Sequence, residues 1–219
     1  LGRVASKAPF PNQVGDMADI LIPTVAQGLM WALMALGVYI TFRVLDIADL
    51  SVEGSFPLGA AVAATALVSG YGVTAAFLLA AVAGALAGIV TGILTTKLKI
   101  PPLLAGILTM IGLYSVNLHV MGKANVALLR VDTVFSYAAG MGLTSDMAMM
   151  AVGLVGVMLV GVILYWFFGT ERGCAIRATG ANQNMARAQG INTNANVVFG
   201  LMLSNGLVAL SGALLAQFQ

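Results

Sequence analysis

The chain has 219 residues, of which 60% are hydrophobic and 8% are charged, and its formal net charge is +2. Soluble domains carry about 25% charged residues, so this composition excludes a protein whose surface faces water on all sides. The small, dispersed positive charge argues against a nucleic-acid-binding surface. The single cysteine, Cys174, excludes an intrachain disulfide and cannot by itself make a cysteine metal site.

Residues 1–19 form a polar N-terminal tail that does not resemble a signal peptide. Arg3 and Lys7 are followed by no apolar core before residue 20. At the other end, the chain stops at Gln219 inside an apolar run. We therefore expect the natural protein to continue beyond this residue and the chain to be truncated at its C-terminus.

Apolar runs of membrane-spanning length follow the tail. A spanning helix needs about 20 apolar residues to cross a hydrocarbon core of roughly 30 Å. Five runs come near that length: Ile20–Phe42, Gly72–Thr96, Ile100–Met121, Met147–Phe168 and Val197–Phe218. A shorter run, Phe56–Ser69, is expected to extend back through Val52–Ser55 and to cross as a short or broken helix. The sequence predicts an all-α, polytopic transmembrane helical bundle with about six membrane segments, forming one transmembrane domain over residues 20–219.

Basic residues predict the orientation of the bundle. Lys97 and Lys99 lie between the third and fourth spans, and Arg172, Arg177 and Arg187 lie between the fifth and sixth. Two crossings separate these loops, so they share one side of the membrane. The positive-inside rule places that side in the cytoplasm, which puts the N-terminal tail outside.

The first polar stretch, over residues 43–57, lies between the first two predicted segments and holds three carboxylates. Ionisable groups at membrane depth are costly and usually face a partner or a wet cavity. Asp49, Ser51 and Glu53 are therefore candidates for the conduit or its cytoplasmic gate. The alternative is a polar loop whose Asp49 or Ser51 caps the next helix. Paired carboxylates also serve acid–base catalysis, but no nucleophile, histidine or metal-ligand set accompanies these.

Small residues mark one face of the predicted span over 72–96. Gly84, Gly88 and Gly92 repeat every four residues and therefore lie on the same side of a helix. Small side chains at this spacing allow a second helix backbone to approach, which predicts helix packing there. A hinge is the alternative interpretation.

Two loops at opposite ends of the next span carry weaker signals. Pro101 and Pro102 suit the start of a helix, where a missing N–H is harmless. Residues 121–130 are expected to form an external loop, which either receives a soluble substrate carrier or is simply solvated. Within the spans, His119 and Asn205 are expected to make interhelical hydrogen bonds, with a proton relay as the alternative for His119.

The connection over residues 170–196 is long for a loop between adjacent spans. Residues 175–179 and 183–189 have helix-forming composition, broken at Gly180 and ended by Gly190. A short helical element that carries arginines on the cytoplasmic side suits the docking of a soluble partner. The alternative is an amphipathic loop that lies on anionic lipid.

At two of these stretches the chain resembles the permease subunits of bacterial ABC importers of the branched-chain amino-acid and ribose-type superfamily. Residues 45–61, LDIADLSVEGSFPLGAA, resemble the I-D-L-S-x-G segment of that family, with Glu53 inserted. Residues 177–191, RATGANQNMARAQGI, resemble its A-T-G-x-N-x-x-A-A-x-x-x-G-I cytoplasmic loop, with Arg187 where the family often has alanine. The likeness covers roughly residues 20 to 219.

Finer features resemble a less characterised branch, whose members are paired with tryptophan- or tyrosine-type substrate-binding lipoproteins. These features are FRVLDIADLSVEGSFPLGAAV at 42–62, TKLKIPPLLAGILTM at 96–110 and MGKANVALL at 121–129. The resemblance implies the membrane-spanning permease subunit of a binding-protein-dependent importer in the bacterial cytoplasmic (inner) membrane. Such a subunit moves a small solute, here an amino acid or a related compound, by alternating access.

The resemblance also implies partners. A homodimer of permease subunits would act with two cytoplasmic ATPases and an external substrate-binding lipoprotein. This chain would bind no cofactor and catalyse no reaction, since ATP and Mg belong to the ATPase. In agreement, the chain contains no P-loop pattern GxxxxGK[ST]. The residues expected in the ATPase-coupling loop are Arg177, Gly180, Asn182, Met185, Ala186 and Gly190.

Other function classes fit less well. A secondary transporter or channel working alone suits a broken helix and a carboxylate near the membrane, but leaves the long cytoplasmic loop without a purpose. A membrane enzyme is disfavoured because no nucleophile–base set or metal cluster can be assembled from the sequence. A purely structural membrane protein would be indifferent to changes at Asp49 or Glu53.

Overall fold

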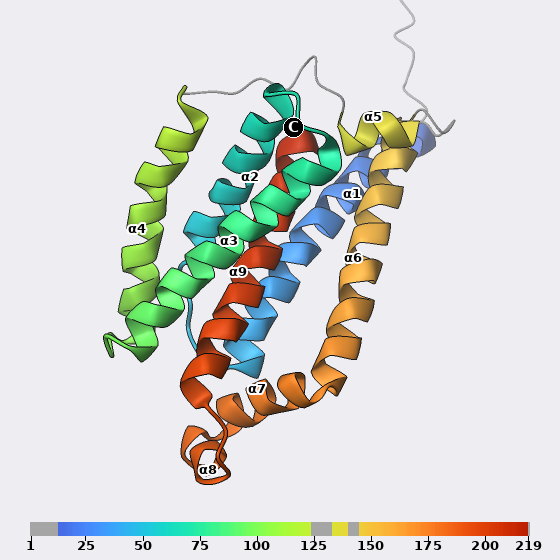
Figure 1. Ribbon diagram of the computed structural model, residues 1–219. Coiled ribbons are helices and arrows are strands. Elements are labelled where there is room, and N and C mark those ends of the chain that lie inside the picture. Colours follow the sequence, from blue (N-terminus) through green and yellow to red (C-terminus); the bar gives the residue numbers. More distant parts are fainter. Residues whose placement is uncertain (1–12, 124–132, 140–144, 219) are drawn as a thin grey trace, which may run out of the picture.

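The computed structural model describes residues 13–123, 133–139 and 145–218, and these form a bundle of helices (Figure 1). Five helices are long and apolar enough to cross a membrane, and α2 is a shorter apolar helix. The predicted all-α bundle with one short segment is confirmed. The helices are α1 (Gln13–Tyr39), the π-helix η1 (Ile40–Val44), α2 (Val52–Val68), α3 (Val73–Thr96), α4 (Pro102–Met121), α5 (Val134–Ala139), α6 (Ser145–Gly169), α7 (Glu171–Ala181), α8 (Gln183–Ala188) and α9 (Thr193–Phe218).

Two helices, α1 and α9, begin four or more residues earlier than the apolar runs predict. α1 begins at Gln13 instead of Ile20, and α9 begins at Thr193 instead of Val197. Both added segments are polar in sequence, QVGDMAD and TNAN. Hydrophobicity marks only the part of a helix that is buried in lipid or protein, so it cannot indicate where the helical backbone itself starts.

The central helix is α9, which packs against α1, α2 and α3 (Figure 1). In its most apolar stretch 67% of the residues are buried inside the bundle, against 17% in α6. α6 packs against α1, and α4 packs against α2 and α3 at the edge of the bundle. The hydrophobic surface of α6 and α4 therefore faces outwards, as expected for helices in contact with lipid.

Glycines allow α3 to lie directly on the backbone of α9. A Cβ atom added to Gly88 would lie 2.8 Å from the Cα of Met202, and one added to Gly92 would lie 2.8 Å from the Cα of Val198. Gly84 meets α9 in the same way. Any larger residue at these positions would force the two helices apart.

The connection between α1 and α2 is irregular. The chain leaves α1 through η1, and residues 45–51, called here the unwound segment, then form no regular structure. The amide of Leu45 donates to the carbonyl of Ile40 (3.0 Å), as a π-helical turn requires. Asp46 follows with φ 54°, in the left-handed region that aspartate tolerates better than most residues. The unwound segment then runs along α9, because Leu45 lies against Gly200.

The basic side chains gather at one end of the bundle, called here the basic end. It comprises η1, the turn between α3 and α4, and the elements α7 and α8 (Figure 1). Its basic residues are Arg43, Lys97, Lys99, Arg172, Arg177 and Arg187. Among the basic residues that the structure describes, Lys123 alone lies at the opposite end. The two basic loops that the sequence predicts on one side of the membrane thus lie at one end, together with Arg43, while the assignment of that end to the cytoplasm stays a prediction.

Of the sequence predictions made near α4, the start of the helix is confirmed and the position of His119 is wrong. The helix begins at Pro102, directly after Pro101, as the two prolines predict. His119 is exposed on α4, so the expected interhelical position is wrong. Residues 1–12 of the predicted tail and 124–130 of the predicted carrier loop lie outside the described residues.

Candidate functional site

A buried polar cluster, Asp49, Ser51 and Asn205, joins the unwound segment to α9. The side-chain amide Nδ2 of Asn205 donates to Oδ2 of Asp49 (2.9 Å), and Ser51 Oγ donates to Oδ1 of Asn205 (3.1 Å). The backbone amide of Ser51 donates to Oδ1 of Asp49 (2.8 Å). The three residues are 1%, 0% and 0% exposed, respectively. We call these residues the midpoint cluster, because Asn205 stands near the middle of α9.

The position of the midpoint cluster is chemically unusual. A carboxyl group half-way along a membrane-spanning helix is costly, and such groups usually serve a function. Irregular backbone at membrane depth is tolerated only where it is buried in protein or lines a cavity. Alternate residues of the unwound segment are buried, namely Leu45, Ile47, Asp49 and Ser51, while Asp46 and Ala48 between them are exposed. A Cβ atom on Gly106 of α4 would lie 2.7 Å from the backbone amide of Leu50 and 3.2 Å from Oδ1 of Asp49. Gly106 therefore leaves the space that the unwound segment occupies.

The structure brings together two of the three predicted gate residues. Asp49 and Ser51 meet in the midpoint cluster, whereas Glu53 is exposed in the first turn of α2. Glu53 is therefore not part of the cluster, and its position suits the favourable interaction of a carboxylate with a helix N-terminus. Ser51 is the N-cap residue of α2 but makes no side-chain capping bond, since its hydroxyl donates to Asn205. The expected interhelical bond of Asn205 is instead a bond to the unwound segment, where its partners Asp49 and Ser51 lie.

The second candidate region is the pair of short helices α7 and α8 at the basic end. Thr170 caps α7 by accepting a hydrogen bond from the amide of Gly173 (3.3 Å). Asn182, with φ −160° and ψ 102°, separates the helices and caps α8 by accepting from the amide of Met185 (3.0 Å). Gly190, with φ 79°, follows α8 in the left-handed conformation that ends many helices.

The predicted helix break at Gly180 is wrong, because the break falls at Asn182 and Gly180 lies inside α7. An asparagine side chain can replace the helix hydrogen bonds that it interrupts, which makes it a stronger boundary than glycine here. Gly180 has a different role. A Cβ atom at this position would collide with the carbonyl oxygen of Val44, so only glycine lets α7 lie against η1.

α7 is anchored to the two elements that carry the midpoint cluster. Ile176, 2% exposed, belongs to one buried apolar group with Leu45 and Leu201. Asn196 Nδ2 donates to Thr179 Oγ1 (2.9 Å), which fixes the start of α9 to α7. α7 is therefore packed against the unwound segment and against α9. Its contact on α9, Leu201, lies one helical turn before Asn205.

Not all residues predicted for the ATPase contact are accessible to a partner. Ala186 is 3% exposed and packs inwards, so it offers no surface to a partner. Met185 on the same short helix is 60% exposed, although a methionine side chain is apolar. Met185 therefore offers an apolar contact at the surface of α8. Asn182 is also exposed, but its side chain is used as a cap.

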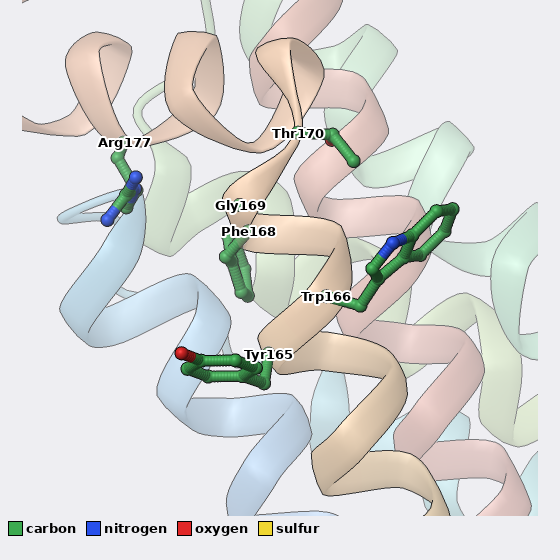
Figure 2. A pocket seen from close by; sticks show the side chains of 6 residues that line it. All are labelled: Tyr165, Trp166, Phe168, Gly169, Thr170 and Arg177. Atoms are coloured by element: carbon green, nitrogen blue, oxygen red, sulfur yellow. The ribbon is translucent and has the colours of Figure 1, made fainter.

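Arg177 lies at a pocket of about 520 Å³ where α6 meets α7 (Figure 2). Tyr165 and Phe168 project from α6 on the same side as Arg177, and Trp166 projects from the other side (Figure 2). Tyr165 and Trp166 are 87% and 72% exposed, which indicates a lipid-facing position. Tyrosine and tryptophan are enriched where lipid meets water, so this ring of aromatics marks the membrane boundary at the start of α7.

No group of three or more potential metal ligands occurs in the parts of the chain that the structure describes. A family model described as the permease component of branched-chain amino-acid transport systems matches residues 20–219. The chain belongs to this permease family. It is accordingly a multi-pass membrane protein of a bacterial transport family.

Several relatives resemble the permease chain along most of its length. It is 40% identical over 198 residues to a tyrosine transport system permease protein of Clostridioides difficile, covering 90% of this chain and 64% of the relative. It is 34% identical to an uncharacterized protein of Rickettsia prowazekii, covering 91% of this chain and 68% of the relative. An autoinducer 2 import system permease protein of Yersinia pseudotuberculosis is 30% identical, with 84% of this chain and 51% of the relative covered. No solved structure matches the chain significantly.

Proposed function

We propose that the permease chain is the membrane-spanning subunit of a binding-protein-dependent ABC importer in the bacterial inner membrane. The observation that carries this proposal is the exposed Met185 on α8, directly after α7, the helix that is anchored to the bundle through Ile176 and Thr179. The gathering of basic residues at the same end supports a cytoplasmic location, as the positive-inside rule requires. A soluble ATPase would contact the short helices α7 and α8 and the apolar side chain of Met185 at this end of the bundle.

The anchoring of α7 suggests how an ATPase would drive transport. Movement of α8 would be transmitted through Ile176 and Gly180 to η1, the unwound segment and α9. These elements meet again at the midpoint cluster, which would act as the gate between outward-open and inward-open states. In the present conformation Asp49 is 1% exposed. The ATPase drives this change only through its different affinity for the two states.

The partners and the solute follow from the family and its named relatives. We infer a homodimer of permease subunits, two cytoplasmic ATPase subunits that hold ATP and Mg, and an external substrate-binding lipoprotein of the tryptophan or tyrosine type. The inferred solute is an amino acid, because one relative is named a tyrosine transport permease and the family is named for branched-chain amino acids. The chain spans 64% of the length of that relative.

Replacing Met185 with glutamate is expected to lower the amount of co-purifying ATPase at least tenfold. The change places a charge in the middle of an apolar contact that is desolvated when the partner binds. The matched control is Leu98→Glu in the turn between α3 and α4. Leu98 is 62% exposed at the same end of the bundle, yet it lies outside α7 and α8. The full chain is co-expressed with an ABC ATPase of the same organism, and the ATPase is quantified after affinity purification of the permease.

Two results would contradict the proposed docking surface. Equal loss of the ATPase in both variants would mean that Met185 has no special role. Failure of any ATPase to accompany the unchanged permease would favour a transporter working alone. Size-exclusion profiles in detergent establish that both variants remain folded.

A further inference from the structure

A groove of about 520 Å³ lies between the end of α3 and the start of α9, at the basic end of the bundle. Its mouth is polar, with Lys97, Asn192 and Asn194. Its deeper part is apolar and includes Ile93 and Phe199, which are 38% and 39% exposed and leave the groove open to its surroundings. The groove is thus amphipathic along its length.

The groove is oriented along the helices that cross the membrane. It extends from Asn192, directly before α9, along this helix to Met202, which at the rise of an α-helix is about 15 Å. The hydrocarbon core is roughly 30 Å thick, so a groove of this length reaches about half-way into it. Its polar mouth lies where the helices end, at the level of the lipid headgroups. A molecule that fits both parts must have a polar head and a long apolar chain.

The positive charge at the mouth of the groove favours a ligand whose polar headgroup is negatively charged. No acidic residue occurs in the sequences of α3, α4 or α9, so the helices beside Lys97 offer no carboxylate to its ammonium group. Arg187 adds a second positive charge at the start of α9, where its Nε donates to Thr193 Oγ1 (2.8 Å) between the two asparagines. Oδ1 of Asn192 accepts from the amide of Ala195 (3.1 Å), which leaves its amide NH₂ group for a ligand.

We propose that this groove is a binding site for an anionic glycerophospholipid. The phosphate of the lipid is held by the ammonium group of Lys97 and the side-chain amides of Asn192 and Asn194. One acyl chain lies along Ile93, Phe199 and Met202. Basic pockets between helices at a membrane surface commonly hold such headgroups, and the apolar depth here distinguishes a lipid from a free phosphate ion. The site depends on the membrane location of the chain, and not on the proposed transport function.

The test measures the affinity of the full, purified chain for dioleoyl phosphatidylglycerol by native mass spectrometry. Dioleoyl phosphatidylcholine and inorganic phosphate are the comparison ligands. Lys97→Ala is expected to weaken phosphatidylglycerol binding about fivefold, the effect of one basic side chain near an anionic headgroup. The matched control Lys99→Ala removes an equal charge two residues away, outside the groove, and is expected to leave the affinity unchanged. Ala195→Trp fills the groove without a change of charge and is expected to weaken binding as well.

Several results would overturn the proposed lipid site. Equal weakening by Lys97→Ala and Lys99→Ala would mean unspecific attraction to a basic surface and would overturn the proposal. So would binding that survives Ala195→Trp, or displacement of the lipid by inorganic phosphate alone. A disulfide between two copies of Asn194→Cys in a Cys174→Ser background would assign the groove to a second copy of the chain. The thermal midpoint of every variant is recorded, and Ala195→Trp keeps the test decisive should Lys97→Ala unfold.

Discussion

Replacing Gly88 with alanine is expected to destabilise the bundle by about 3 kcal/mol, the upper part of the range for overpacked cores. The new methyl group would collide with the carbonyl oxygen of Leu201 and lie 2.8 Å from the Cα of Met202. Both are backbone atoms of the central helix, so no side-chain rotation relieves the collision. The measurement is the midpoint of thermal unfolding in detergent, with the fraction of monodisperse protein after purification.

The matched control for Gly88 is Gly112→Ala in α4. No atom lies within 4 Å of a Cβ added to Gly112, and alanine is favoured over glycine in a helix by about 1 kcal/mol. This control should leave the midpoint unchanged or raise it. The same lowering in both variants would mean that glycine matters here for flexibility, as in the hinge interpretation, and not for the contact between α3 and α9.

Exchanging the amide and carboxylate partners of the midpoint cluster is expected to restore part of the stability that each single change removes. The bond that Nδ2 of Asn205 donates to the carbonyl oxygen of Leu201 (3.1 Å) stays lost, because a carboxylate cannot donate it. Asn205→Asp sets two carboxylates against each other, and Asp49→Asn sets two amide groups against each other. Each single variant should lose about 3 kcal/mol of stability, because a buried group is left without its partner. In the double variant, the amide now at position 49 can still accept from the backbone amide of Ser51 and donate to the carboxylate now at position 205. That carboxylate in turn accepts from the Ser51 hydroxyl.

The readout for the exchange is again the thermal midpoint of the purified permease, together with transport in the assembled importer. Ser51→Ala is the graded control, since it removes one neutral hydrogen bond and should cost about 1 kcal/mol. If the double variant is no more stable than the single variants, the hydrogen bonds of the cluster do not hold the unwound segment to α9. Recovery of stability without recovery of transport would assign the cluster a role in gating as well as in packing.

The sequence was sufficient to predict the helical bundle because long apolar runs have no other stable form in a membrane. The close packing of α3 also left a readable pattern, since glycines at every fourth position lie on one face of a helix. The unwound segment was recognisable as polar residues between two apolar runs. Its course along α9 was not, because residues 45–51 carry no periodic pattern.

The predictions for Gly180 and Ala186 are wrong for local reasons. Gly180 and Asn182 are only two residues apart, and both residue types can interrupt a helix. Gly180 serves instead the close contact of α7 with Val44, which is far away in the sequence and therefore leaves no local signal. Ala186 and Met185 are neighbours whose exposures differ because they lie on different sides of α8. A six-residue helix has too few residues for an amphipathic pattern to indicate which side faces outwards. Gly106 had no signal at all, since one glycine in a membrane helix is ordinary.

The measurement that tests the account most directly is uptake of radiolabelled tyrosine by proteoliposomes that hold the full permease, its ATPase and its binding protein. We expect accumulation that requires ATP on the side of α7 and α8, fails with ADP and persists when an ionophore collapses the ion gradients. Competition by unlabelled amino acids then defines the solute class. Accumulation by the permease alone, driven by a proton or sodium gradient and abolished by the ionophore, would contradict the account and assign the chain to the secondary transporters.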